Sequence, residues 1–276
     1  MPPVTPAEIV LMFLAGATGG SLGALLGIGG GPFLVPFLVL VAGLPFRAAA
    51  GISLATVIAT STVVSANAAS RQLINLRLGI VLEVATTAGG LTGGLTALML
   101  PPSLLRFIFA AVMIAIALVM LTRLNRRNVI LDDELDPGLL GGQYHEDESG
   151  GVVTYRVKRL GVALGMSFVA GNLSTILGIG GGVIKVPVLN AWCGIPLRAA
   201  AATSAFMIGV TATTGAVIYY ARGEVVPALA AGAVLGVLAG SRAGMMMGSR
   251  ARAKWLKLLL ALILLAVSVL MLMRAG

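Results

Sequence analysis

Long runs of apolar residues, separated by short polar connections, make up most of this chain. The runs cover residues 8–44, 48–70, 78–100, 103–122, 160–195, 198–221, 225–248 and 254–273. About 20 consecutive apolar residues are enough for a helix that crosses a bilayer. The pattern therefore predicts an all-α membrane protein, in which the one long polar segment, 123–159, joins two halves.

The first run of each half is too long for a single span, and both carry the same interruption. The motif Leu26-Gly27-Ile28-Gly29-Gly30-Gly31 recurs as Leu177-Gly178-Ile179-Gly180-Gly181-Gly182. Residues 22–53 align with 173–204 at a constant offset of 151, and 17 of the 32 positions are identical. Glycine costs a helix roughly 1 kcal/mol per residue relative to alanine, so we expect both helices to break here. We interpret the chain as two homologous repeats, 1–124 and 158–276, joined by a polar cytoplasmic linker, 125–157.

Composition agrees with a membrane location. The 276 residues are 58% hydrophobic and 11% charged, whereas soluble domains carry about 25% charged residues. The net charge of +9 comes mainly from basic residues in the connections, which is typical of membrane orientation and not of nucleic-acid binding. Cys193 is the only cysteine, which excludes an internal disulfide and a cysteine-based metal cluster; we expect no metal and no cofactor. The first run lacks the features of a cleaved signal peptide, so we interpret it as mature structure.

The distribution of arginine and lysine over the connections distinguishes two topologies. If all eight runs cross once, the basic residues divide 10 to 7 between the two faces. If each broken run returns to its own side, they divide 13 to 4, which fits the positive-inside rule far better. We therefore expect two inverted repeats, each a broken or re-entrant helical segment plus three transmembrane helices, with both termini outside. The arm 8–27 would measure roughly 30 Å as a helix, so a full crossing by this arm stays an open alternative.

Paired helix breaks inside a bilayer are typical of transporter binding sites. Inverted halves can bring the two breaks together near the midplane, where a water-filled cavity would cover the freed backbone groups. A helix that starts after the glycines presents unpaired N–H groups and a partial positive charge to an anion. The candidate substrate-binding residues are Gly29, Gly30, Gly31, Gly180, Gly181, Gly182, Lys185, Asn67, Asn172, Thr175 and Arg242. The alternative is that the glycines only allow close helix packing.

The charged residues inside the apolar runs include Lys185, Arg242 and Glu83. Lys185 follows the second break by three residues, where a cation costs at least about 2.5–3.5 kcal/mol. We expect it to bind an anion rather than to reach an interface. Arg242 lies in the middle of its run and can pair with a substrate or with Glu83. Glu83 is close to Arg77 in the sequence, which favours a carboxylate at the membrane interface.

Other polar and small residues receive structural interpretations. Hydroxyl groups are frequent in the runs 48–70 and 198–221, where most should bond to carbonyls of their own helix. Glycine recurs every four residues at Gly232, Gly236, Gly240, Gly244 and Gly248. This spacing predicts a smooth face for helix packing. The stretch 19–23 fits the serine-hydrolase motif G-x-S-x-G but lacks its strand-turn-helix setting, and the only histidine, His145, lies in the polar segment, so we expect no enzyme.

The duplicated motifs resemble those of the sulfite exporter TauE/SafE family, also called the 4-toluene sulfonate uptake permease family. The resemblance covers nearly the whole chain and rests on three matched pairs of motifs. These are Gly27-Ile28-Gly29-Gly30-Gly31 with Gly178-Ile179-Gly180-Gly181-Gly182, Val35-Pro36 with Val186-Pro187, and Pro45-Phe46-Arg47-Ala48-Ala49 with Pro196-Leu197-Arg198-Ala199-Ala200. It implies a bacterial inner-membrane transporter of sulfite, sulfoacetate, taurine-related or other sulfonates, often an exporter, driven by an ion or proton gradient.

Three hypotheses for the function follow. The first is a secondary active transporter of small sulfur-containing anions, which alternates access to a site between the breaks. Its partners would be the anion, the lipid bilayer and a coupling proton or ion, with no nucleic acid. The second is a passive anion channel that uses the same helix ends. The third, a transporter of cations or metals, is disfavoured because acids and histidines are scarce within the runs. The oligomeric state and the direction of transport stay open.

Overall fold

The computed structural model describes residues 4–26, 29–70, 72–122, 136–146, 151–248 and 253–273. Several residues used in the sequence analysis therefore lie outside the described residues. These are Gly27 and Ile28 of the first glycine motif, and Arg71, Arg123, Arg126, Arg127, Arg250, Arg252 and Arg274 of the count of basic residues.

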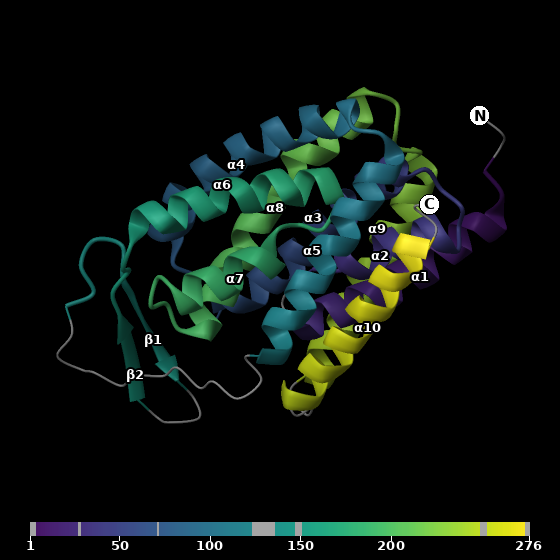
Figure 1. The fold of residues 1–276 in the computed structure, drawn as a ribbon. Helices are drawn as coiled ribbons and strands as arrows, with labels where there is room; N and C mark the ends of the chain where they lie inside the picture. The colour runs from purple at the N-terminus through teal and green to yellow at the C-terminus, as the bar shows by residue number, and fades with distance from the viewer. Residues whose placement is uncertain are drawn as a thin grey trace.

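Helices account for most of the described chain (Figure 1). They are α1 (Pro6–Leu26), α2 (Gly31–Leu40), α3 (Phe46–Ser70), α4 (Leu76–Met99), α5 (Pro102–Thr122), α6 (Leu160–Leu177), α7 (Gly182–Ala191), α8 (Leu197–Ala221), α9 (Pro227–Gly248) and α10 (Ala253–Met273). Among the described residues, six helices are long and apolar enough to cross a membrane: α1, α3, α4, α6, α8 and α9. The mainly helical class predicted from the apolar runs is thus confirmed.

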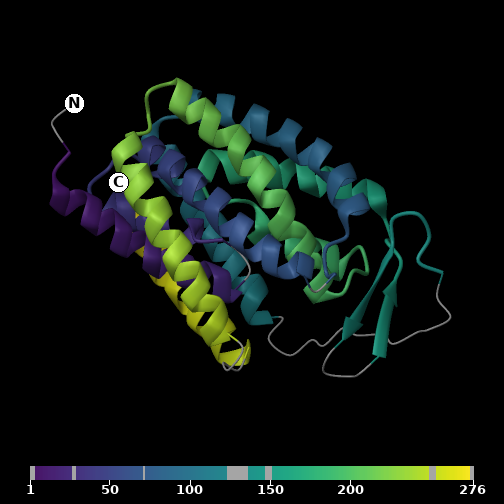
Figure 2. The same ribbon diagram turned by 180° about the vertical axis from the view of Figure 1, so that it is seen from behind.

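The polar segment between the halves contains a β-hairpin, so the all-α prediction is wrong at this point. Strand β1 (Gly142–Glu146) pairs antiparallel with β2 (Gly151–Tyr155), and Tyr144 lies opposite Val153. Tyr144, Val153 and Tyr155 are buried, which gives the hairpin an apolar face. Aromatic and β-branched residues on a half-buried surface favour strands. Figures 1 and 2 show the hairpin at one end of the helical body.

Both glycine motifs interrupt their helices as predicted. In the first half, α1 is described up to Leu26, Gly29 and Gly30 are not helical, and α2 begins at Gly31. In the second half the helix ends at Leu177 and the next begins at Gly182. Gly29 has a φ of 78° and Gly180 a φ of 80°, a left-handed conformation that residues with a side chain rarely adopt. Breaking the helix therefore depends on glycine at these positions.

The helices pack in pairs that correspond between the two halves. Helix α1 packs on α9 as α6 packs on α4, α3 packs on α8, and α5 packs on α10. The bounds repeat as well: adding 151 to the bounds of α2, α3 and α5 gives those of α7, α8 and α10. The offset of 151 found in the motifs therefore also relates the bounds of these three pairs of helices.

One end of the helical body is organised around Arg47 at the start of α3. Its guanidinium donates hydrogen bonds to the carbonyl oxygens of Ala97, Leu98 and Leu100 at the C-terminus of α4. It also lies 3.7 Å from Glu224, in the loop between α8 and α9. The α2–α3 loop, the end of α4 and the α8–α9 loop thus lie together, at what we call the Arg47 end.

The opposite end, which we call the linker end, gathers the hairpin and two loops. The side-chain amide of Asn75, just before α4, donates hydrogen bonds to the carbonyl of Leu140 at 2.8 Å and to the hydroxyl of Tyr155 at 3.2 Å. The backbone N–H of Lys158 donates to the carbonyl of Cys193, after α7, at 2.9 Å. The α3–α4 loop, the linker and the α7–α8 loop therefore lie at the same end.

Each broken segment begins and ends at one end of the molecule. Ile9 lies against Gly232 and Ser21 against Gly244, so α1 runs parallel to α9 and starts at the Arg47 end, where α2 finishes. In the second half Phe168 and Asn172 follow α4 in the same direction. Helix α6 therefore starts at the linker end, where α7 also finishes.

Candidate functional site

The two glycine breaks meet inside the protein. A Cβ atom added to Gly31 would lie 2.6 Å from the carbonyl oxygen of Gly178 and 2.9 Å from the Cα of Ile179. Ser53 of α3 donates a hydrogen bond of 2.6 Å to the same Gly178 carbonyl. Gly31, Gly178 and Ile179 are all buried. The sequence-based expectation that the breaks approach each other in the interior thus matches the geometry.

Within the described residues the two breaks are in contact and the cavity beside them is small, which differs from the open cavity that was expected. A cavity next to Gly29, lined by Val57, Ser61, Ala205 and Ile208 among others, has a volume of about 10 Å³. That volume holds about one water molecule. Because glycine lacks a side chain, the two backbones touch instead of leaving an opening. An anion could reach this region only if the halves moved apart.

The N-terminus of α7 has unused hydrogen-bonding capacity around it. Gly181 is the residue that precedes the helix, and no side chain caps the first turn. The hydroxyls of Ser174 and Ser204 lie beside Gly181 and Gly182, respectively, and both are completely buried. Within the described residues neither hydroxyl has a hydrogen-bond partner, and the same holds for Thr175. Buried donors without partners next to a helix N-terminus form a neutral but electropositive environment that suits an anion.

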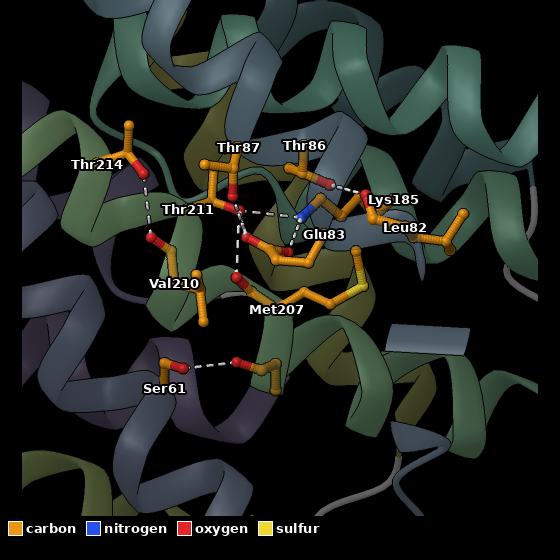
Figure 3. A network of polar contacts seen from close by, with 11 residues as sticks. Ser61, Leu82, Glu83, Thr86, Thr87, Lys185, Met207, Val210, Thr211 and Thr214 are labelled. Atoms are coloured by element: carbon orange, nitrogen blue, oxygen red, sulfur yellow. Dashed lines mark hydrogen bonds and ion pairs between the residues drawn. The ribbon is translucent and has the colours of Figure 1, made fainter. Parts of the chain in front are cut away.

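One turn further along α7, Lys185 takes part in a buried polar cluster with Glu83 and Thr87 of α4 and Thr211 of α8 (Figure 3). Its Nζ lies 3.8 Å from Oε2 of Glu83 and 3.4 Å from the hydroxyl oxygen of Thr211. The Thr211 hydroxyl is 2.7 Å from Oε1 of Glu83, and Thr87 donates to the same oxygen at 3.3 Å. We call these four residues the Lys185 cluster.

Glu83 lies inside the protein beside Lys185, and its position at the membrane interface stays a prediction. Glu83 is only 8% exposed, and Lys185 is 2% exposed. The closeness of Glu83 to Arg77 in the sequence suggested the membrane interface. Helix α7, however, extends far enough into the helical body to place Lys185 next to the Glu83 carboxylate. Charge balance would have pointed to the pair, because Glu8 and Glu83 are the only acidic residues within the described helices.

The other candidate residues divide into those near the breaks and those elsewhere. Thr175 is buried beside Gly90 and Gly215, close to the second break. Asn172 bonds to Thr92 at 3.1 Å, where α6 packs on α4. Asn67 is exposed near the end of α3, and Arg242 is exposed on α9. Glu83, one of the two partners suggested for Arg242, is paired with Lys185 instead.

The two charged residues of the cluster have no charged counterparts at the offset of 151. At the offset of 151, Lys185 corresponds to Leu34 and Glu83 to Val234. Thr211 corresponds to Thr60, whose hydroxyl bonds to the Thr56 carbonyl of its own helix. The two breaks are therefore alike in backbone but different in charge, and the second break carries the candidate chemistry.

The chain is similar to known membrane proteins over most of its length. A profile of the family described as "Sulfite exporter TauE/SafE" matches residues 12–271. The chain is similar to "Probable membrane transporter protein YunE" of Bacillus subtilis, at 24% identity over 94% of this chain and 96% of that protein. A "Probable membrane transporter protein" of Methanocaldococcus jannaschii is 28% identical over 76% of this chain and 71% of its own length. "Sulfite exporter TauE/SafE family protein 6" of Arabidopsis thaliana is 42% identical over 28% of this chain and 18% of its own. No solved structure matches the chain.

Proposed function

Because the chain belongs to the sulfite exporter TauE/SafE family, we propose that it is a secondary active transporter of small sulfur-containing anions such as sulfite, sulfoacetate or other organosulfonates. Family membership makes it a multi-pass membrane transporter and not an enzyme. The proposal extends this to the substrate class, to export as the direction and to the bacterial inner membrane as the location. The observation that carries it is a buried lysine beside a helix N-terminus whose neighbouring hydroxyls have no partner within the described residues.

The anion would bind at the start of α7. The backbone N–H groups of Gly181 and Gly182 supply donors, and glycine leaves room for a tetrahedral or pyramidal oxyanion to approach them. The hydroxyls of Ser174 and Ser204 lie beside these glycines, and Lys185 follows one turn later. Lysine recognises an oxyanion as a point charge, while hydroxyl and N–H donors fix its orientation. A site built from N–H groups, hydroxyls and an ammonium group prefers small oxyanions to cations.

Inverted repeats would allow the site to open alternately to the two sides. Helices α1 and α2 begin and end at the Arg47 end, whereas α6 and α7 begin and end at the linker end, as the contacts of each segment support. A twofold axis in the membrane plane would exchange the two sets. The contact between Gly31 and Gly178 then acts as a closed gate, and rocking of one half on the other would open it.

A passive anion channel is the second candidate, and transport against a gradient separates the two. The purified protein is reconstituted into liposomes, sulfoacetate or sulfite is added outside, and its accumulation in the lumen is followed under an imposed proton or sodium gradient. We expect accumulation above the external concentration. Movement that only equalises the concentrations would support the channel.

The variant Lys185→Ala tests the site. We expect at least a tenfold loss of sulfoacetate binding and transport, because the only buried cation near the α7 N-terminus within the described residues is removed. Lys158→Ala is the matched control, since Lys158 is exposed at the linker end and should keep its binding. Binding that survives Lys185→Ala, or cations that bind as well as sulfonates, would contradict the proposal.

A further inference from the structure

The ion pair between Lys185 and Glu83 leaves both groups incompletely satisfied. At 3.8 Å the nitrogen–oxygen separation exceeds a hydrogen bond, and Oε2 of Glu83 has no hydrogen-bond partner within the described residues. The ammonium group of Lys185 has three donors, and its one hydrogen bond given by the structure is the 3.4 Å contact with Thr211. Lys185 therefore has room for a further acceptor, such as an oxygen of a bound anion.

Charge balance limits what can bind there. In this conformation the buried site holds one cation and one carboxylate, and its net charge is zero. An anion that reached Lys185 would leave the site with one excess negative charge in a water-poor interior, which is costly. Neutrality returns if Glu83 takes up a proton as the anion binds.

Thr211 can support Glu83 in both of its charge states. The Thr211 hydroxyl lies 2.7 Å from Oε1 of Glu83 and 3.1 Å from the carbonyl oxygen of Met207. When Glu83 is ionised, the hydroxyl donates its single proton to the carboxylate. When Glu83 is protonated, the acid can donate to the hydroxyl oxygen while the hydroxyl donates to the Met207 carbonyl. The Thr211 hydroxyl proton therefore has an acceptor in both charge states of Glu83.

The surroundings make Lys185 the charged group that faces Glu83. Helix α6, which packs on α4, contains no titratable residue, and α7 contains only Lys185. On α8 the ionisable residues are Arg198 at its start and the tyrosines Tyr219 and Tyr220 near its end. The other charged residue of α4, Arg77, is exposed.

We propose that Glu83 is the proton-binding site of the transporter and that anion and proton bind together. This inference rests on the proposed function. The substrate anion displaces the Glu83 carboxylate from Lys185, the released carboxylate binds one proton, and the reverse happens when the anion leaves. Charge balances in the step: one anion and one proton enter a neutral site, which stays neutral for a monovalent sulfonate. The protein then moves one proton in the same direction as each anion.

Proton uptake on binding can be measured on the unmodified protein. Methanesulfonate is titrated into the purified transporter by calorimetry in two buffers with different ionisation enthalpies. We expect one proton taken up per anion bound. Binding without proton uptake would overturn the inference and leave the anion transporter standing, whereas no binding of methanesulfonate, sulfite or sulfoacetate would overturn both.

Transport in liposomes that contain a pH-sensitive dye tests the assignment to Glu83. An inward gradient of methanesulfonate should acidify the lumen with the wild-type protein. Glu83→Gln, which imitates the protonated acid, should still transport the anion but with at least a tenfold smaller acidification per anion. Glu8→Gln is the matched control, because Glu8 is the other helical carboxylate in the described chain and is exposed near the N-terminus of α1. A Glu83→Gln protein that acidifies the lumen as wild type would overturn the assignment.

Discussion

Lys185 and Glu83 show how one residue decides whether another can stay charged inside the protein. Both side chains are almost fully buried, and each is the nearest opposite charge for the other. The net contribution of a buried ion pair to stability is small, because desolvation offsets most of the attraction. Removing one partner is different, since the remaining charge stays in the interior without compensation.

This asymmetry predicts the stability of single and double variants. Lys185→Met should lower the free energy of unfolding by about 3–5 kcal/mol, because Glu83 is left unpaired. The double variant Lys185→Met with Glu83→Gln should recover most of that loss. Thermal unfolding in detergent measures both. Lys158→Met, at an exposed position, should change stability by less than about 0.5 kcal/mol. Equal destabilisation of the single and the double variant would mean that the pair carries no such coupling.

For single residues, the sequence predicted the burial of Lys185 but not that of its partner Glu83. A lysine in an apolar run must be buried or must reach an interface, and the nearby glycine motif indicated burial. Glu83 was assigned from its distance to Arg77 along one helix, although the deciding contact comes from α7. The partnerless hydroxyls of Ser174 and Ser204 could not be predicted, because hydroxyls in helices usually bond to their own backbone.

Among the elements, the contact between α1 and α9 follows directly from glycine spacing. Gly232, Gly236, Gly240 and Gly244 lie against the carbonyl oxygens of Ile9, Phe13, Ala17 and Ser21, respectively. Both helices advance by four residues per contact, so their backbones stay close over several turns. The packing face predicted from the spacing of four residues is confirmed for these four glycines. The side chains near Gly248 lie outside the described part of the chain.

Two glycine-to-alanine substitutions should therefore act in opposite directions. A Cβ at Gly240 would overlap the Ala17 carbonyl, so Gly240→Ala should separate α1 from α9 and cost about 1–3 kcal/mol of stability. Gly165 of α6 has no atom within 4 Å of the added Cβ. Gly165→Ala should be neutral or stabilising by up to about 1 kcal/mol, because alanine favours the helix. Thermal unfolding compares the two, and equal tolerance would show that the α1–α9 contact is loose.

Element boundaries could be predicted where apolar runs and glycine motifs define them, and not in the linker. The helix breaks and the main helices agree with the prediction, because the length of an apolar run and the positions of proline and glycine determine where a helix begins and ends. The linker looks like a polar loop by composition. Its strands become stable through burial of Tyr144, Val153 and Tyr155 and through the bonds from Asn75 to Leu140 and Tyr155. The residues that make these contacts are far apart in the sequence, so a local sequence pattern cannot predict them.

For the whole molecule, the distribution of charge and the position of the loops agree. The predicted 13-to-4 division of basic residues requires that the 41–45 and 222–226 connections share one face and that 72–75, the linker and 192–196 share the other. The contacts of Arg47 with Glu224 and of Lys158 with Cys193 meet this requirement. What the sequence could not predict is whether the centre is open, since glycine permits both a cavity and the backbone contact between Gly31 and Gly178.

Equivalent positions in inverted halves should face opposite sides of the membrane, and thiol labelling can test this. Val41 and Trp192 are separated by the offset of 151, follow α2 and α7 directly, and are 64% and 48% exposed, respectively. In a Cys193→Ala background, we expect Val41→Cys to react with a membrane-impermeant thiol reagent in intact cells. Trp192→Cys should react only after permeabilisation, because the positive-inside rule predicts that the basic linker end faces the cytoplasm. Leu139→Cys in the linker, at 87% exposure, should follow Trp192→Cys and serves as the control for that face. Labelling of Val41→Cys and Trp192→Cys from the same side would mean that the halves are parallel, and a gate between inverted halves would then be ruled out.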